Sequence, residues 1–277
     1  IRAAAKNYRS VAVLTNPDDY NLLAEKLKDK NGMLGKDFLF DLSKKAFLHT
    51  AEYDAAISAY LNKDSDENFP KLKIQVLRKE LDMRYGENPH QKAAFYCDKN
   101  VPNSSLSNFS HLHGKELSFN NLNDANNAWE CVKSFDQPTC VIVKHANPCG
   151  VCSASTIDNA YLGAFATDPT SAFGGIIAFN KEINEATALL VMNQFVEVLI
   201  APSFSDEAMR IFKKKDNVRL LSVPIGPEND LHDYKKIAGG WLVQTIDDHK
   251  LDINKCEVVS KLKPTKKQLE DMLFAWK

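Results

Sequence analysis

Short apolar runs rich in β-branched residues alternate with helical patterns through the second half of this chain, and this alternation limits its fold most. The runs occupy residues 141–144, 176–179, 196–200 and 218–223. Between them, apolar residues recur at helical spacing in residues 156–166, 186–194 and 205–214. Strands that alternate with helices imply a layered structure in which at least some strands pair in parallel. The sequence therefore predicts an α/β fold.

The N-terminal part of the chain has a different pattern. Residues 37–61 carry a long helical pattern, and a short apolar run at 11–14 predicts a buried strand. The segment 62–70 is polar, ends in a proline and is the best linker candidate. Alternating residues at 71–77 predict a strand after it. We therefore expect one domain over residues 1–65 and a second over residues 66–277.

Composition narrows the class of protein. The chain has 277 residues, of which 44% are hydrophobic and 26% charged, as in ordinary soluble globular proteins. A formal net charge of −1 gives no reason to expect a polyanionic partner. No apolar run approaches membrane-spanning length. Among six cysteines only Cys149 and Cys152 are closely spaced, which favours a reducing, cytoplasmic setting.

The most informative motif is VIVKHANPCG at residues 141–150, where an apolar run ends in Lys144 and His145. A permanent cation beside a group that titrates near neutral pH suits proton transfer next to a developing negative charge. Successive side chains of a strand point to opposite faces, so the two can share a site only if the backbone leaves the β conformation. Asn147 and Pro148 offer a reason for such a break. The alternative is an exposed lysine and a histidine that fills a turn.

Two further segments suggest ligand contacts. The loop RYGENPHQ at residues 84–91 gathers directional donors, and Arg84 suits a phosphate or carboxylate. The glycines of SAFGG at residues 171–175 would let the backbone approach a ligand closely. A polar turn and a plain bulge are the alternatives. Lys6, in a helical pattern, reads from its chemistry alone as a solvated surface residue.

The motif PCGVC at residues 148–152 matches half of the zinc deaminase signature. The other half requires a glutamate two residues after a histidine, and none follows His90, His111 or His113 in that place. We therefore expect no catalytic metal. A redox pair of thiols and two ordinary reduced thiols both remain open.

Taken in order, several blocks resemble the family of bifunctional purine biosynthesis enzymes that combine AICAR transformylase with IMP cyclohydrolase. IRAAAKN and KAFLHTAEYDAAISAYL resemble the end of the cyclohydrolase domain. The first half of the transformylase domain is matched by RYGENPHQKAAFY, HGKELSFNNLNDANNAW, VKHANPCG, SAFGGIIAFN and VEVLIAP. The resemblance covers essentially the whole chain.

The resemblance implies formyl transfer from 10-formyl-tetrahydrofolate to AICAR, followed by ring closure to IMP with loss of water. It implies that His145 accepts a proton during the transfer and that Lys144 stabilises the transition state. Lys6 matches the general acid/base of the cyclohydrolase. This implied role replaces the interpretation of Lys6 as a solvated surface residue. The substrate-binding positions that the resemblance implies are Arg84, Tyr85, Asn121, Phe173, Gly174 and Glu197.

The resemblance also implies a fold and partners. Residues 1–65 would form the C-terminal piece of a methylglyoxal synthase-like domain. Residues 66–277 would form the first half of a cytidine deaminase-like α/β domain without the zinc. It implies a homodimer with shared transformylase sites, in which Arg84 serves the partner's site. Cys152 departs from the usual family motif.

Both ends of the chain look cut, because Ile1 opens directly in a helical pattern and no glycine closes the last helix. We therefore expect an internal fragment that alone catalyses neither reaction. Two alternatives stand beside the leading hypothesis. One is a zinc-dependent deaminase, and the other is a nucleotide-binding module without catalysis.

Overall fold

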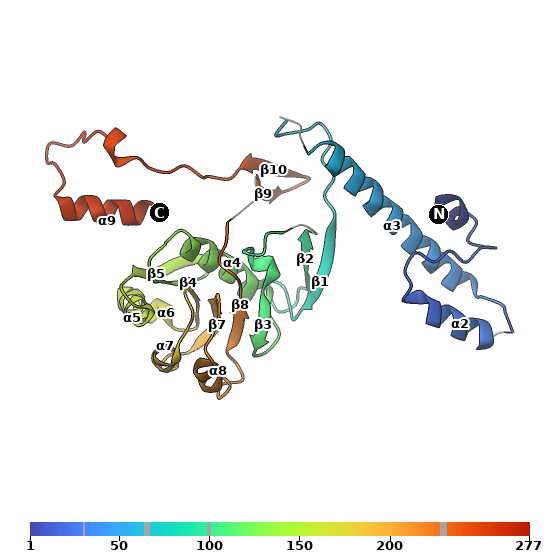
Figure 1. Cartoon of the computed structure of the whole chain (residues 1–277), viewed down its shortest axis with the longest axis horizontal. Helices are drawn as coiled ribbons and strands as arrows, with labels where there is room; N and C mark the ends of the chain where they lie inside the picture. The colour runs from blue at the N-terminus through green and yellow to red at the C-terminus, as the bar shows by residue number, and fades with distance from the viewer. Residues whose placement is uncertain (30, 64–66, 99–100, 228–231) are drawn as a thin grey trace. The chain divides into compact units, whose positions relative to one another are not determined.

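The computed structural model describes residues 1–29, 31–63, 67–98, 101–227 and 232–277. The chain divides into two compact units, Ile1–Arg78 and Lys79–Lys277. In Figure 1 the first unit has the blue colours of the N-terminal part, and the second has the remaining colours up to red. The linker expected at 62–70 falls in the first unit, and its residues 64–66 lie outside the described ones.

Three helices form the described part of the first unit: α1 (Arg2–Lys6), α2 (Asp19–Asp29) and α3 (Lys36–Leu61). The short α1 packs on α3, where Ala5 and Ala46 are fully buried and the Ser43 hydroxyl donates to the Ala5 carbonyl at 2.8 Å. The strand predicted at 11–14 is wrong, because these residues form neither helix nor strand. A strand needs a hydrogen-bonded neighbour, and none of the described strands pairs with residues 11–14.

A mixed six-stranded sheet forms the centre of the second unit (Figure 1). Its strand order is β3-β8-β7-β6-β4-β5, in which β6, β7 and β8 pair in parallel and the other pairs are antiparallel. This confirms the predicted α/β class with partial parallel pairing. The strands are β3 (Ser110–His113), β4 (Thr139–Lys144), β5 (Asn147–Ser153), β6 (Gly175–Phe179), β7 (Val196–Ala201) and β8 (Arg219–Ser222).

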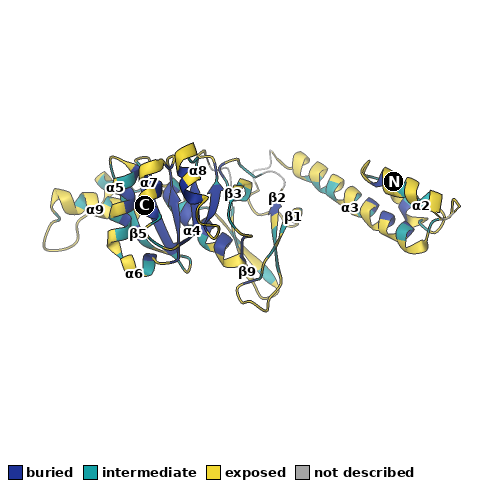
Figure 2. Cartoon of the chain, turned by 90° about the horizontal axis from the view of Figure 1, so that it is seen from below, coloured by how far each residue is buried: buried dark blue, intermediate teal, exposed yellow. Residues whose placement is uncertain are grey.

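Helices cover both faces of this sheet, so its four inner strands β4, β6, β7 and β8 are almost fully buried, as the dark blue arrows of Figure 2 show. On one face, α4 (Phe119–Lys133) packs its buried Trp129 and Ala128 over Val141 and Val143. Alternate residues of the same strand, such as Ile142, face the opposite layer. That layer contains α5 (Ile157–Thr167), α6 (Pro169–Ala172), α7 (Glu185–Val191) and α8 (Asp206–Phe212). Strand periodicity thus divides the core between two layers.

The remaining elements lie outside this sheet. The strand predicted at 71–77 is wrong, because β1 (Leu77–Met83) begins only at its last residue and residues 71–75 are exposed. β1 pairs with β2 (Ala93–Asp98), and β9 (His232–Ile237) forms a hairpin with β10 (Gly240–Thr245). The 3₁₀ turns η1 (Leu106–Asn108) and η2 (Ile253–Lys255) and the last helix, α9 (Lys266–Trp276), complete the chain. None of the described helices combines the length and apolar character that crossing a membrane requires.

Candidate functional site

The turn between β4 and β5 has unusual backbone geometry. Lys144 pairs with Asn147, so His145 and Ala146 form a two-residue hairpin loop. Their φ angles are 52° and 64°, in the left-handed region that a type I′ hairpin turn requires at both positions. Asn-Gly is the usual sequence there, and a non-glycine residue in this region costs about 1–3 kcal/mol. The chain therefore holds strain at His145, one of the two residues that the sequence singled out, and at Ala146 after it.

The predicted departure from the β conformation after Lys144 is confirmed, but its cause differs from the one expected. Asn147 and Pro148 do not break the pairing; they begin β5. Because β5 is an edge strand, it accommodates a proline that has no N–H to donate. Ile142 pairs with Gly150 while Val143 pairs with Pro148, so Cys149 is an extra, bulged residue.

Lys144 reaches the start of β6. Its half-buried side chain donates a hydrogen bond from Nζ to the Gly174 carbonyl at 2.8 Å. Gly174 has a φ of 66°, and a Cβ there would lie 3.3 Å from Lys144 Nζ. An ammonium has three donors, so this bond leaves two others for a ligand. The structure thus brings together Lys144 and Gly174, two of the predicted site residues, with the exposed His145 next to Lys144 in the chain.

Two exposed aromatic rings flank Gly174. Phe173 is 64% exposed and Phe195 is 45% exposed, and their ring centroids lie 5.4 Å apart. The Gly174 N–H donates to the Phe195 carbonyl at 2.8 Å, which fixes the two segments together. Sequence reasoning predicted Phe173 and missed Phe195, although an aromatic residue just before an apolar strand offers a signal.

A second group of predicted residues lies under α4. Asn121 donates from Nδ2 to Glu197 Oε2 at 2.9 Å, and its Oδ1 accepts from the Ser118 N–H in a capping box. Gly175 pairs with Val196 and Ile176 with Val198, so Glu197 is a bulged residue of β7. A bulge redirects a side chain, and this one turns Glu197 toward α4.

Arg84 and Tyr85 join the same end of α4. The Tyr85 carbonyl accepts from the Phe119 N–H at 3.3 Å, and the Arg84 N–H donates to the Leu117 carbonyl at 3.5 Å. The Arg84 guanidinium stacks 5.5 Å from the centre of the Tyr85 ring. The predicted loop at 84–91 therefore delivers both side chains next to the first turn of α4.

Helix α4 also contacts the strained turn. Asp124 lies one helical turn after Asn121, and its Oδ1 accepts from the Ala146 N–H at 2.8 Å. One helix thus holds both groups at one edge of the sheet, where β4 ends and where β6 and β7 begin. Sequence reasoning missed Asp124, because a carboxylate on an amphipathic helix carries no distinctive signal.

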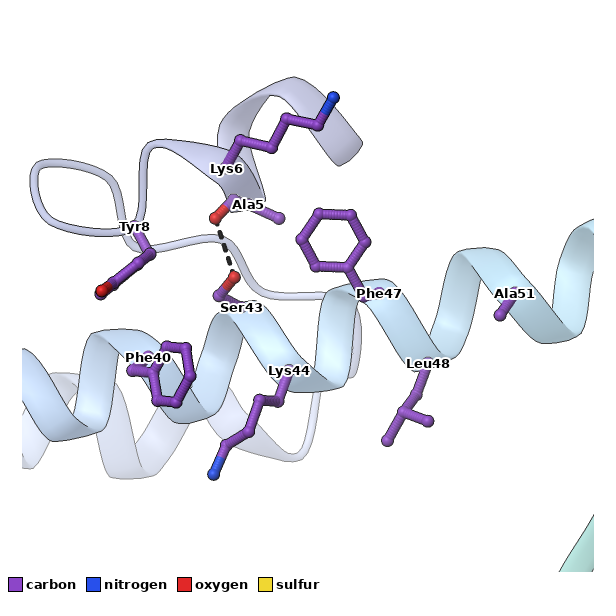
Figure 3. Close-up of a pocket in the computed structure, with 9 residues that line it drawn as sticks. All are labelled: Ala5, Lys6, Tyr8, Phe40, Ser43, Lys44, Phe47, Leu48 and Ala51. Atoms are coloured by element: carbon purple, nitrogen blue, oxygen red, sulfur yellow. Dashed lines mark hydrogen bonds between the residues drawn. The ribbon is translucent and has the colours of Figure 1, made fainter.

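Lys6 lies in the first unit. It is the exposed last residue of α1, at an open groove of about 690 Å³ between α1 and α3. Figure 3 shows its side chain extending along α1 and away from α3. Tyr8, Phe40 and Phe47 supply aromatic surface to the groove.

The cysteines are free thiols in the structure. Burial raises the pKa of the Cys149 thiol and of the Cys152 thiol. Both thiols are therefore protonated at neutral pH, which lowers their reactivity. Within the described ranges, no three His, Cys, Asp or Glu side chains lie close enough together to hold a metal ion.

With this geometry in place, comparison with known proteins identifies the family. The model of the AICARFT/IMPCHase bienzyme family matches residues 4–277. The chain belongs to the AICARFT/IMPCHase family. The family named by the resemblance is thereby confirmed, and its two activities in purine biosynthesis are AICAR formyl transfer and IMP cyclisation. The zinc deaminase and the non-catalytic module are not favoured by this match.

A solved structure also matches part of this AICARFT/IMPCHase chain. It is a putative formate dehydrogenase accessory protein from Desulfotalea psychrophila, at 12% identity and a TM-score of 0.31. The match covers 57% of this chain and 66% of that chain, just under two thirds of its length. Similarity at this level does not bear on fold or function.

Proposed function

We propose that this protein transfers a formyl group from 10-formyl-tetrahydrofolate to AICAR at the sheet edge that carries Lys144 and His145, and that it cyclises the product to IMP. The strained two-residue turn carries the proposal. Left-handed backbone at two successive non-glycine residues persists only where surrounding contacts hold it, and such strain clusters at functional sites.

The chemistry follows from the two side chains. An amine conjugated to an imidazole ring is a weak nucleophile, so His145 takes its proton as the amine nitrogen bonds to the formyl carbon. The carbonyl oxygen becomes an oxyanion, which the Lys144 ammonium stabilises with a donor left free by Gly174. The bond from the formyl carbon to the folate nitrogen then breaks, and the protonated His145 gives its proton to that leaving nitrogen.

The other predicted residues suit the nucleotide. Arg84 matches a phosphate or carboxamide group, and Tyr85 stands beside it. Asn121 and Glu197 offer an amide and a carboxylate from a single hydrogen-bonded pair. Phe173 offers an exposed ring and Gly174 an approachable backbone. These six positions form the proposed substrate site of the transformylase.

For the cyclohydrolase, we propose that Lys6 is the general acid/base.

The proposal also includes a domain boundary after residue 65, between a methylglyoxal synthase-like and a cytidine deaminase-like domain without catalytic metal. It places the protein in the cytoplasm as a homodimer in which Arg84 serves the partner's site. Sedimentation of a monomer at assay concentrations would contradict the shared site.

The test uses paired variants of the intact protein. His145→Ala is expected to lower formyl transfer by about 10²–10⁴-fold, the usual worth of a general base, and to leave cyclisation unchanged. Lys6→Met is expected to give the reverse pattern. The control is His249→Ala, which removes an exposed histidine far along the chain. Formyl transfer that survives His145→Ala within threefold of the control would exclude the proposed base.

A further inference from the structure

Arg219, the first residue of β8, is a buried cation at the edge that carries the proposed site. It is only 8% exposed. Its Nε donates to the Glu116 carbonyl at 3.0 Å and its Nη1 to the Asn217 carbonyl at 3.4 Å. None of the described carboxylates forms an ion pair with it. Burying a guanidinium whose only partners among the described residues are two backbone carbonyls costs folding free energy. We therefore expect a role of Arg219 other than stabilising the fold.

The side chain lies on the face of the sheet that Glu197 occupies. Arg219 pairs in parallel with Val198, which packs toward α4, and paired residues of neighbouring strands share a face. Burial lowers the pKa of the Arg219 guanidinium. Glu197 and the Tyr85 phenol raise this pKa through their charges, and the positive charge of Arg84 lowers it further. These three groups, all in the proposed substrate site, therefore lie near enough to interact electrostatically with Arg219.

The guanidinium also anchors the backbone that carries those groups. Its acceptor, Glu116, precedes Leu117, whose carbonyl accepts from the Arg84 N–H, and Ser118, which caps α4. The segment fits tightly against β8. A Cβ on Gly114, which has a φ of 98°, would lie 2.3 Å from the Val218 carbonyl oxygen. The Arg219 bond therefore holds the loop that leads into α4.

We propose that Arg219 is a positioning residue for the nucleotide site, holding Arg84, Tyr85, Asn121 and Glu197 in one arrangement through its hydrogen bonds and its charge. The inference rests on the proposed function only in taking AICAR as the ligand. Arg219 does not touch the reacting atoms, so its loss affects binding of the nucleotide and not the chemical step.

The test compares Arg219→Met with Arg219→Lys in the intact protein. AICAR binding is measured by calorimetry, and KM and kcat are measured for formyl transfer. For Arg219→Met, the Kd and KM for AICAR are expected to rise by about tenfold or more, because charge-assisted bonds to the site's backbone are lost. Both kcat at saturating AICAR and the KM for the formyl donor stay within about threefold.

Arg219→Lys keeps the charge but cannot reproduce the fork of donors, so it is expected to recover part of the AICAR affinity. Arg210→Met, which removes an exposed arginine of α8, is the control and leaves AICAR affinity unchanged. Unchanged AICAR affinity in folded Arg219→Met, or a loss of kcat alone, overturns the inference. If Arg219→Met does not fold, the test rests on Arg219→Lys. An AICAR affinity of Arg219→Lys equal to that of the parent protein then overturns the inference.

The calorimetric readout separates this inference from the proposed function. A parent protein that binds AICAR but transfers no formyl group would contradict the proposed chemistry, while the effect of Arg219 on binding could still be measured and would support the inference. A parent protein that does not bind AICAR would overturn both.

Discussion

At the scale of single residues, the sequence indicated the chemistry more clearly than the geometry. Lys144 and His145 stood out because a cation and a histidine end an apolar run. The positive φ angles of His145 and Ala146 could not be predicted, since His-Ala lacks the Asn-Gly signature of this turn. Arg219 was also missed, although an arginine inside the apolar run at 218–223 is a visible exception to the pattern.

The strain at Ala146 can be tested by removing its cause. Ala146→Gly keeps the N–H that donates to Asp124 and removes the left-handed penalty for a Cβ. The free energy of unfolding is expected to rise by up to about 1 kcal/mol, the penalty less the entropy cost of glycine. Ala154→Gly, at a position without positive φ, is expected to lower it. Denaturant unfolding of both variants checks this, and equal losses in both would show that the turn is not strained.

At the scale of elements, the helices and buried strands were predicted well, because their periodicity reflects a two-layer core. The helix predicted over residues 205–214 is present as α8, and the Ser205 hydroxyl caps it by accepting from the Ala208 N–H. The sequence missed β5, because Asn147-Pro148 resembles a break, and only the edge position of the strand makes proline acceptable. It also missed β3, whose SHLH sequence has little apolar content.

The short helix α6 offers a pH test, because it leads directly into Phe173 and Gly174. Asp168 caps it, and hydrogen bonds from Ser171 lower the pKa of the Asp168 carboxyl. A lowered pKa in the folded state stabilises the protein above the unfolded pKa of about 3.9, and that contribution is lost as pH falls through the folded value.

Asp168→Ala is therefore expected to reduce stability at neutral pH. The stability difference from the parent protein should shrink as pH falls from about 4 toward more acidic values. Thermal unfolding across this pH range measures the difference. Asp136→Ala, at an exposed position outside any helix, is the control and is expected to show no such trend. A difference that is constant with pH would show that the cap acts without its charge.

At the scale of the whole molecule, the structure has two compact units, and the family to which the chain belongs combines two activities. Two strands predicted in residues 11–14 and 71–77 were wrong. Local alternation does not make a strand without a neighbouring strand to pair with. The order of strands in the central sheet depends on long-range pairing, so it could not be predicted from local patterns.

The central claim is that Lys144 and His145, at the start of the strained turn, perform formyl transfer. The most direct test is the single-turnover rate of Lys144→Met with AICAR and the formyl donor saturating. Removing the cation at the developing oxyanion is expected to lower that rate by about 10²–10³-fold. IMP cyclisation should be unchanged, and Lys181→Met, at an exposed lysine, should match the parent protein in both activities. A Lys144→Met rate within threefold of the parent would contradict the account.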